Sequence, residues 1–310
     1  MVTFCDDVLA GLQLPQKSIP SKYFYDRRGS ELFEEICNLK EYYIFSSEVE
    51  ILTARAPELT QVTGRKCNLI ELGSGSSVKT KFLLDQLESG SAYVPVDVSQ
   101  ELLEEVTRDL RLTYPELKIH PVAGDFCSSL GHLAEACDKR LGNALFFPGS
   151  TIGNFNPDSA EDILRRCREL AGKNGFMIIG VDLVKTKSVL EAAYNDSRGV
   201  TAAFNLNLLT RMNEELSACF DLSTFQHSAF FNEKESRIEM HLVSLNSQTI
   251  PIAGQQVHFD RDETIHTENS YKYRPEDFIK LAQKCGFSAH LGWTDSKGYF
   301  SVFILSSSSE

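Results

Sequence analysis

The sequence predicts an α/β protein in which a parallel sheet covered by helices is joined to a second lobe. Short apolar segments alternate with helical segments between residues 68 and 184, and the last of these segments, 175–184, is almost entirely apolar. Strands that are buried on both faces and alternate with helices are typical of a parallel sheet in a layered α/β fold. A glycine-rich turn follows the first strand, and the alternation stops near residue 186, where an insertion begins.

The first 60 residues show none of the alternation typical of strands. Leu32, Phe33, Ile36 and Leu39 recur at the spacing of one helix face, which predicts a helix in this segment. We assign residues 1–60 to the second lobe, as its N-terminal part.

The core of the parallel sheet is expected within residues 61–185. Its strands are predicted at residues 68–72, 92–98, 118–126, 143–150 and 175–184. Its helices are predicted at residues 78–89, at 100–114 and from Pro157 onward, where a proline suits the first helical turn.

Residues 186–270 are expected to form the inserted part of the second lobe, which is helical to about residue 218 and has antiparallel strands over residues 221–265. The chain then returns to the parallel sheet over residues 271–310, with a helix that opens at Arg274 and a closing hairpin. Ligands of open α/β sheets bind at the carboxyl ends of the strands, and the second lobe is expected to cover that edge.

Composition favours a small molecule as the ligand. The 310 residues include 31 Lys and Arg against 43 Asp and Glu, which gives a net charge of −12. A net acidic surface disfavours nucleic acid and anionic membranes as partners. No apolar run approaches the roughly 18 residues of a membrane span, and the first residues carry acids where a secretory signal carries Lys or Arg. We expect a cytoplasmic protein that is a monomer.

The cysteines and histidines do not form a recognisable metal motif. Eight cysteines and seven histidines are present, but no CxxC pair and no HxxxH spacing occurs among them. Reduced thiols are expected in a chain of this length without a signal peptide. We therefore expect neither a structural zinc site nor a metal cofactor.

The strongest local signal is the segment Glu71–Ser77, directly after the first strand. Glycines at this place allow a backbone turn to approach a ligand at a helix N-terminus. A dinucleotide fingerprint requires a third glycine where Val78 stands, and no P-loop spacing occurs. An acid before the glycines and a second one, Asp97, at the end of the next strand suit S-adenosylmethionine (SAM), whose ribose hydroxyls can donate to Asp97. The alternative is that Gly73 and Gly75 only make a tight turn.

Two further loops follow predicted strands. Asp125 and Phe126, after the third strand, can meet an adenine by a hydrogen bond and by ring stacking. The loop Pro148–Asn154, after the fourth strand, faces the transferred methyl group in a SAM-binding fold and can hold a substrate carboxylate or amine. Alternatively, Asn154 or Asn156 caps the helix that follows.

A last signal lies near the end of the insertion. Glu268 and Ser270 are two residues apart on a segment predicted to be extended, so their side chains point to the same side. A carboxylate and a hydroxyl in this arrangement can bind both nitrogens of a ring. A surface turn is the alternative for this segment, and interface packing is the alternative for Tyr42 and Tyr194.

Seven segments, in order along the chain, together resemble the histidine Nα-methyltransferase family of ergothioneine biosynthesis. The resemblance covers nearly the whole chain, from about Lys17 to Phe303. The segments are KYFYDRRGSELFEEICNLKEYYIFSSEVEIL, ELGSGSSVKTKFLL, PGSTIGNF, DLVK, AAYNDSRGVTAAFN, RIEMHL and TENSYKYRPE.

The resemblance implies a Rossmann-like SAM-dependent methyltransferase fold with a substrate lobe, and it implies roles for particular residues. The residues implied for the SAM site are Tyr25, Phe33, Gly73, Lys79, Asp97, Asp125 and Phe126. The residues implied for the substrate are Asn154 and Tyr194 at the α-carboxylate, Glu268 and Ser270 at the imidazole, and Tyr42 and Met240 around the pocket.

The implied reaction is three methyl transfers from SAM to the α-amino nitrogen of L-histidine, which give hercynine, in the first step of ergothioneine biosynthesis. An in-line displacement at a sulfonium requires a neutral amine at the right distance rather than an acid–base pair. The proton acceptor stays open between a tyrosine, a water relay and a carboxylate.

Three alternatives to this function are a methyltransferase for another amino acid such as tryptophan, a nicotinamide dehydrogenase, and a binding subunit without catalysis. Glu268 disfavours tryptophan, because an indole offers one donor and no charge. Val78 disfavours the dehydrogenase. Asn269 stands where the resemblance leads us to expect a hydrophobic residue, and it bears on side-chain specificity.

Overall fold

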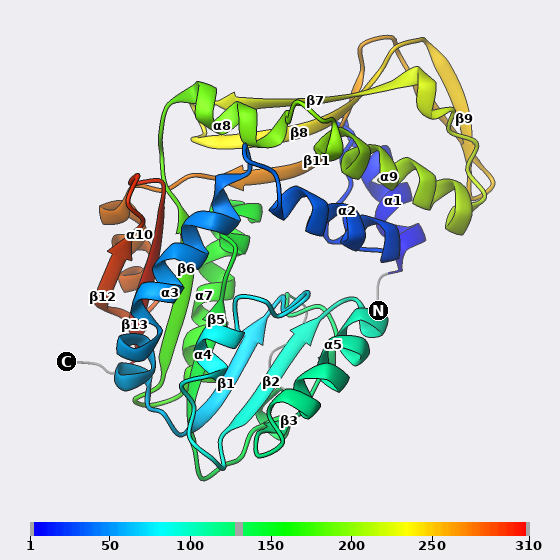
Figure 1. Cartoon of the computed structure of the whole chain (residues 1–310). Coiled ribbons are helices and arrows are strands. Elements are labelled where there is room, and N and C mark those ends of the chain that lie inside the picture. The colour runs from blue at the N-terminus through cyan, green and yellow to red at the C-terminus, as the bar shows by residue number, and fades with distance from the viewer. Residues whose placement is uncertain (1–2, 128–132, 308–310) are drawn as a thin grey trace. The chain divides into compact units, whose positions relative to one another are not determined.

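The computed structural model describes residues 3–127 and 133–307, which divide into two compact units (Figure 1). The α/β unit comprises Ile44–Val184 and the chain from Lys272 onward. The second unit comprises the chain up to Tyr43 together with Lys185–Tyr271. Each unit is therefore assembled from two stretches that are distant in the sequence.

The α/β unit is built on one sheet with the strand order β12-β13-β6-β5-β1-β2-β3, and β4 also pairs with β2. All pairs are parallel except β13 with β6 and β12 with β13. The predicted α/β class is confirmed, and the arrangement is Rossmann-like because the strand order reverses beside β1. The strands are β1 (Cys67–Leu72), β2 (Ala92–Asp97), β3 (Lys118–Ile119), β4 (Val122–Ala123), β5 (Gly142–Phe147), β6 (Phe176–Asp182), β12 (Ser288–Thr294) and β13 (Phe300–Ser306).

The central strands are apolar because both of their faces are buried. All six residues of β1 are buried, and so are six of the seven residues of β6. Ile163, Leu164 and Cys167 of one helix pack in the same core as Phe147 and Met177 of the sheet. The helices of this unit are α3 (Tyr43–Thr63), α4 (Lys81–Leu84), α5 (Gln100–Thr113), α6 (Leu133–Ala136), α7 (Pro157–Ala171) and α10 (Pro275–Lys284), with a 3-10 turn η2 (Thr151–Asn154).

Two elements of the α/β unit are shorter than the sequence predicts. The third strand, expected over residues 118–126, is split into β3 and β4, which both pair with β2. Pro121 stands between them and cannot donate a ladder hydrogen bond, so the strand breaks there. The helix expected over residues 78–89 is reduced to α4.

The N-terminal segment of the second unit ends at Tyr43 rather than near residue 60. Polar side chains on α3 explain the difference, because they bond to groups of the α/β unit. Ser47 donates to Asp295 (3.2 Å), and Glu50 accepts from the backbone N–H of Ser296 (2.7 Å). A helical pattern in the sequence does not show with which unit a helix packs.

The second unit combines helices with a three-stranded antiparallel sheet of order β11-β8-β7 and a separate hairpin of β9 and β10. Its last strand, β11, continues to Tyr271, beyond the end at residue 265 that the sequence predicts. The elements are α1 (Phe4–Leu12), η1 (Ser21–Phe24), α2 (Arg27–Cys37), α8 (Lys187–Tyr194), α9 (Val200–Leu216), η3 (Leu222–Thr224), β7 (Phe225–Asn232), β8 (Arg237–Ser244), β9 (Gln248–Ile252), β10 (Gln255–Phe259) and β11 (Thr264–Tyr271).

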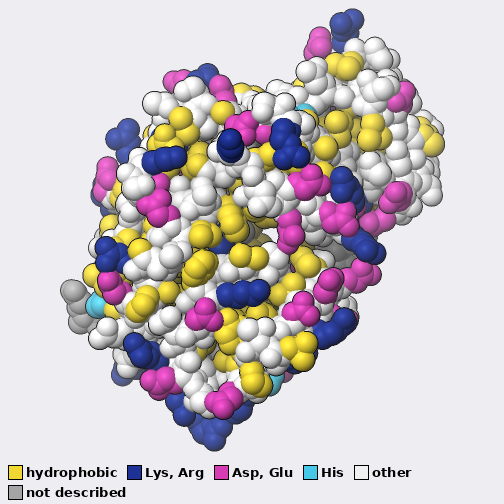
Figure 2. All heavy atoms as spheres, viewed as in Figure 1, with side chains coloured by type: hydrophobic (Ala, Val, Ile, Leu, Met, Phe, Trp, Pro, Cys, Tyr) yellow, Lys and Arg dark blue, Asp and Glu magenta, His cyan; other side chains and the backbone are white. Residues whose placement is uncertain are grey.

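Charged side chains of both signs lie interspersed on the face of the molecule shown in Figure 2. The net charge of −12 is therefore not gathered into one acidic patch on that face. Among the described residues, no helix combines the length and the apolar character that crossing a membrane requires.

Candidate active site

The glycine-rich turn after β1 has a backbone that requires glycine. Gly73 has φ +73° and Gly75 has φ +47°, both in the left-handed region that disfavours a side chain. A Cβ added at Gly75 would have no heavy atom within 4 Å, so the surface of the turn is open there. A Cβ added at Gly73 would lie 3.8 Å from the ring of Phe126. The turn thus offers bare backbone beside an aromatic ring.

Asp97 ties this turn to the end of β2. One carboxylate oxygen accepts from the N–H of Gly75 (2.8 Å) and the other accepts from the N–H of Ser99 (2.9 Å). An ionised carboxylate has about four acceptor positions, so both oxygens keep capacity for a ligand hydroxyl. The predicted turn and the predicted acid are therefore brought together at the carboxyl edge of the sheet.

Asp125 and Phe126 lie next to this edge, after β4. Asp125 accepts from the N–H of Cys127 (2.8 Å). The ring of Phe126 makes edge contacts with Phe147 (5.4 Å between centroids) and Phe155 (6.2 Å). These contacts hold one face of the aromatic ring in place beside Gly73.

Glu71, the acid before the glycines, lies under the turn and is fully buried, with 1% exposure. It accepts hydrogen bonds from the hydroxyls of Thr80 (2.5 Å) and Tyr93, and Tyr93 also bonds to Ser77 (3.0 Å). Burial raises the pKa of Glu71 to about 8, although the hydrogen bonds from the Thr80 and Tyr93 hydroxyls act to lower it. Glu71 therefore supports the turn from below.

Lys79 is held by a residue that sequence reasoning missed. Its ammonium lies 2.6 Å from Glu48 of α3, whose side chain is fully buried. The same Glu48 oxygen accepts from the N–H of Gly149 (2.8 Å), so it joins the turn after β1 to the loop after β5. A Cβ at Gly180 would lie 2.1 Å from the other Glu48 oxygen, so only glycine leaves room for the carboxylate. Glu48 carries no motif, and only its burial reveals its role.

The loop after β5 shows which of its two asparagines caps the following helix, a question that the sequence left open. Asn156 caps α7, since its side chain accepts from the N–H of Ser159 (2.9 Å). Asn154 ends η2 with a half-buried side chain. Within residues 3–127 and 133–307, no protein group is hydrogen-bonded to that side chain, which is therefore available to a ligand.

The second unit brings the predicted substrate residues of β11, β8 and α8 together. Glu268 lies directly opposite Met240 in the register of β11 and β8, so both side chains point to one face of the sheet. Ser270 is two residues further along β11, on the same face. Its hydroxyl accepts from the hydroxyl of Tyr194 (2.8 Å). Asn269 points to the opposite face, opposite Glu239.

Tyr42 and the two aromatic residues predicted for the cofactor form a second cluster in this unit. The ring of Tyr42 makes edge contacts with Tyr194 (6.2 Å) and Phe33 (6.3 Å). Phe33 in turn contacts Tyr25 (5.5 Å). Burial, and then the proximity of Tyr194, raise the pKa of Tyr42 well above its ordinary value, so its phenol stays neutral.

The predicted residues thus fall into two groups, each brought together within its own unit. The α/β unit holds Gly73, Lys79, Asp97, Asp125, Phe126 and Asn154. The second unit holds Tyr25, Phe33, Tyr42, Tyr194, Met240, Glu268 and Ser270.

The chain matches a family model described as "Histidine-specific methyltransferase, SAM-dependent" over residues 4–307. It is 39% identical to a histidine N-alpha-methyltransferase of Mycolicibacterium smegmatis and 40% identical to one of Mycobacterium tuberculosis, over 96% of this chain and 93% of each relative. It is 29% identical to ergothioneine biosynthesis protein 1 of Neurospora crassa, over 91% of this chain and 32% of that protein. Among solved structures, a magnesium protoporphyrin IX methyltransferase of Synechocystis aligns with a TM-score of 0.49 at 11% identity, over 92% of this chain and 97% of that one.

Proposed function

The chain belongs to the family of histidine-specific, SAM-dependent methyltransferases, and from this premise we propose that it converts L-histidine to hercynine by three methyl transfers to the α-amino nitrogen. This reaction is the first step of ergothioneine biosynthesis. The observation that carries the proposal is the match of the family model over residues 4–307, together with 39% and 40% identity to two histidine N-alpha-methyltransferases over nearly their whole length.

We assign the methyl donor to the carboxyl edge of the α/β sheet. The open surface at Gly75 supports this, because a ligand can approach the backbone there. Asp97 keeps acceptor capacity for ribose hydroxyls, and Phe126 offers a ring for an adenine. Lys79 adds a positive charge suited to the carboxylate of the donor. Tyr25, Phe33 and Asp125 complete the proposed set.

We assign the imidazole to Glu268 and Ser270. The same-face geometry on β11 supports this assignment, because a carboxylate and a hydroxyl then meet the two nitrogens of one ring. Met240, directly opposite Glu268, forms an apolar wall, and Tyr42 adds an aromatic one. Asn154 and Tyr194 are assigned to the α-carboxylate; Asn154 can donate from its amide, and Tyr194 can donate once its hydroxyl proton turns from Ser270 to the ligand.

The reaction requires the protein mainly to position the amine against the methyl group of SAM and to allow the amine to lose a proton. The first two transfers require the amine to be neutral before it attacks the methyl carbon, and the third meets a tertiary amine. We propose that no metal takes part in this displacement. The raised pKa of Tyr42 argues against its phenolate as the base, and the acceptor stays open between another tyrosine, a water relay and a carboxylate.

One incubation experiment tests the proposal. The protein is mixed with SAM and, in separate reactions, with histidine, tryptophan or phenylalanine, and the products are weighed by mass spectrometry. We expect mono-, di- and trimethylated histidine in succession and little product from the other two. Equal methylation of tryptophan would contradict the assignment of L-histidine as the specific substrate. Absence of any methylated product would leave a binding protein, and heat on adding NAD would indicate a dehydrogenase.

A further inference from the structure

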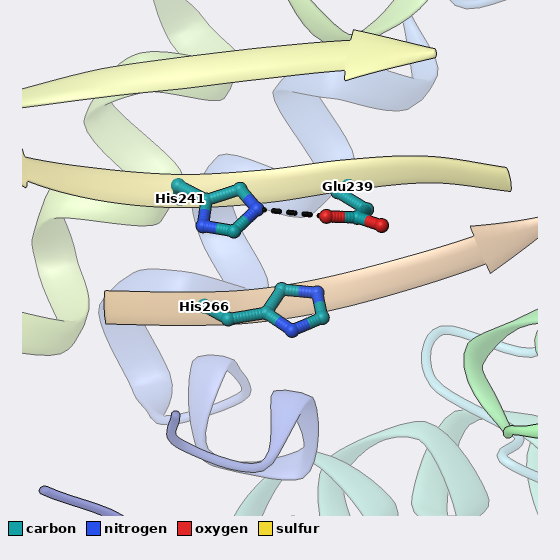
Figure 3. A group of neighbouring side chains, drawn as sticks. All are labelled: Glu239, His241 and His266. Carbon is teal, nitrogen blue, oxygen red and sulfur yellow. Dashed lines mark hydrogen bonds and ion pairs between the residues drawn. The ribbon is translucent and has the colours of Figure 1, made fainter. Parts of the chain in front are cut away.

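A cluster of three metal-ligating side chains lies on the face of the three-stranded sheet opposite to Glu268 and Met240. Glu239 and His241 are two residues apart on β8, so both point to the same face. His266 of β11 lies directly opposite His241 in the strand register. Figure 3 shows the three side chains gathered over these two strands.

The ligand atoms of this cluster are close to one another. Nε2 of His241 lies 3.1 Å from Oε2 of Glu239, near the distance between two ligand atoms of one tetrahedral zinc ion. One atom from each of the three residues lies within 4.8 Å of the others. Glu239 and His241 are each only 7% exposed, whereas His266 is partly exposed and leaves a side from which an ion can enter.

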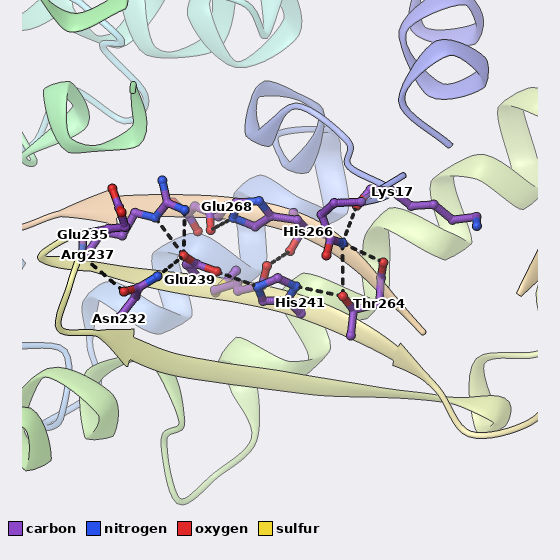
Figure 4. A network of polar contacts seen from close by, with 12 residues as sticks. Lys17, Asn232, Glu235, Arg237, Glu239, His241, Thr264, His266 and Glu268 are labelled. Carbon is purple, nitrogen blue, oxygen red and sulfur yellow. Dashed lines mark hydrogen bonds and ion pairs between the residues drawn. The ribbon is translucent and has the colours of Figure 1, made fainter. Parts of the chain in front are cut away.

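Glu239 and His241 are also each held by their other polar atom, as metal ligands in proteins usually are. Oε1 of Glu239 accepts from Arg237 (2.8 Å) and Asn232 (2.8 Å), which leaves Oε2 toward His241. Nδ1 of His241 lies 3.2 Å from the hydroxyl of Thr264. Figure 4 shows this ring of contacts around the cluster.

We propose that Glu239, His241 and His266 bind one divalent late first-row transition-metal ion, of which Zn²⁺ is the type, with water as the fourth ligand. Two imidazoles and one carboxylate are a ligand set of zinc and its neighbours rather than of Mg²⁺ or Ca²⁺, which select oxygen. The site would join β8 to β11, and it is independent of the proposed methyl transfer.

Binding requires two local changes. The rings of His241 and His266 are stacked, with centroids 4.7 Å apart and planes 12° apart, so their lone pairs lie in nearly parallel planes. His266 has to turn about its Cβ–Cγ bond and exchange its hydrogen bond to the Glu268 carbonyl (3.0 Å) for the metal. In His241 the ring proton has to reside on Nδ1, where the Thr264 hydroxyl can accept it.

The motif search on the sequence could not find this site. The CxxC and HxxxH patterns test ligands that are neighbours along the chain. Here Glu239 and His241 occupy a strand, and the antiparallel register supplies His266 from another strand. Lys17 and Ile19 bond to the backbone of His266 from the other side of β11, so the third ligand is held in place on both sides.

The test uses the untagged, full-length protein after treatment with a chelator. Zn²⁺ binding is measured by calorimetry, and Co²⁺ is added as a spectroscopic probe because its visible absorption reports tetrahedral coordination. We expect one saturable equivalent of Zn²⁺, a rise in the thermal unfolding temperature with Zn²⁺ but not with Mg²⁺, and tetrahedral Co²⁺ bands. Glu239→Gln and His266→Asn should each weaken binding by roughly 10–100-fold or more.

Two matched variants separate this site from other ligands of the chain. His258→Asn removes a histidine whose side chain is 57% exposed on β10, and Cys219→Ser removes an exposed thiol, and neither should change the affinity. Absence of saturable binding would overturn the proposal, and so would binding that survives His266→Asn or disappears in Cys219→Ser. His266 is partly exposed, so its asparagine variant carries the test if Glu239→Gln does not fold.

Discussion

At the scale of single residues, the hydrogen bonds of Asp97 decide the first prediction. Its carboxylate already accepts from Gly75 and Ser99, and the proposed ribose hydroxyls add to these bonds. Asp97→Ala should weaken SAM binding by roughly 10–100-fold, the value of a charge-assisted hydrogen bond. Calorimetry with SAM measures this, and Asp109→Ala, at an exposed position of α5, is the matched control. Unchanged affinity in a folded Asp97→Ala protein would remove the ribose from this residue.

Glu268 and Met240 carry the prediction on specificity, because they face each other across β11 and β8. Glu268→Ala should lower kcat/KM for histidine by roughly 10–150-fold, since a charged hydrogen bond contributes about 1.5–3 kcal/mol. Once this bond is lost, apolar side chains are rejected less strongly. Met240→Val adds space, so the double variant should accept tryptophan better than either single variant.

The measurement is kcat/KM for histidine, phenylalanine and tryptophan in the wild type, both single variants and the double variant. Glu235→Gln, on an exposed glutamate of the same unit, serves as the control. A ratio of histidine to tryptophan that Glu268→Ala leaves unchanged would place the imidazole elsewhere and leave the methyltransferase activity intact.

At the scale of elements, the packing of α3 on β6 depends on one glycine. A Cβ at Gly180 would lie 2.1 Å from Glu48 and 2.8 Å from the ring of Phe300. Gly180→Ala should therefore lower the free energy of unfolding by about 1–3 kcal/mol, as overpacking of a core does. It should also weaken SAM binding, because a displaced Glu48 releases Lys79.

A matched variant in the same sheet controls for the general effect of replacing glycine. Gly142 begins β5, and a Cβ there has no heavy atom within 4 Å. Gly142→Ala should leave both stability and SAM affinity close to those of the wild type. Denaturant titration measures the stability, and calorimetry measures the SAM affinity. Equal stability of the two variants would show that α3 can move away from the added Cβ without loss of stability.

At the scale of the whole molecule, buried carboxyls set the dependence of stability on pH. The pKa of Glu71 is raised from 4.5 to about 8, so the native state binds its proton more tightly than the unfolded state. The stabilisation from this group is complete below pH 4.5 and is lost as the pH rises through about 8. Glu239 has the opposite sign, and its contribution is lost as the pH falls from 4.5 toward about 2.

We therefore expect the urea concentration at the denaturation midpoint to decrease as the pH rises from 5 to 8, because Glu71 becomes ionised over this interval. Glu71→Gln, which stays neutral, should flatten this slope while it keeps most of the hydrogen bonds to Thr80 and Tyr93. Urea titrations at several pH values test this. An identical slope in the variant would assign the pH dependence to other groups.

The sequence alone determined the parallel sheet, the glycine turn and the acid at the end of β2. These features depend on local physics: continuous apolar segments for strands buried on both faces, and φ values that glycine adopts at Gly73 and Gly75. The pairing of Glu268 with Ser270 on one face also follows from the period of a strand. The family resemblance indicated the reaction, because seven segments that follow one another along most of the chain agree with one family.

Only the tertiary structure decided which unit α3 joins, because an amphipathic pattern does not name its partner. The role of Glu48 and the gathering of Glu239, His241 and His266 also depend on packing and strand register, which bring together residues far apart in the sequence. Likewise, Asn156 rather than Asn154 caps α7, because the helix begins at Pro157, directly after Asn156. Long-range contacts of this kind leave no periodic or spaced signal along the chain, so they appear only when the fold is formed.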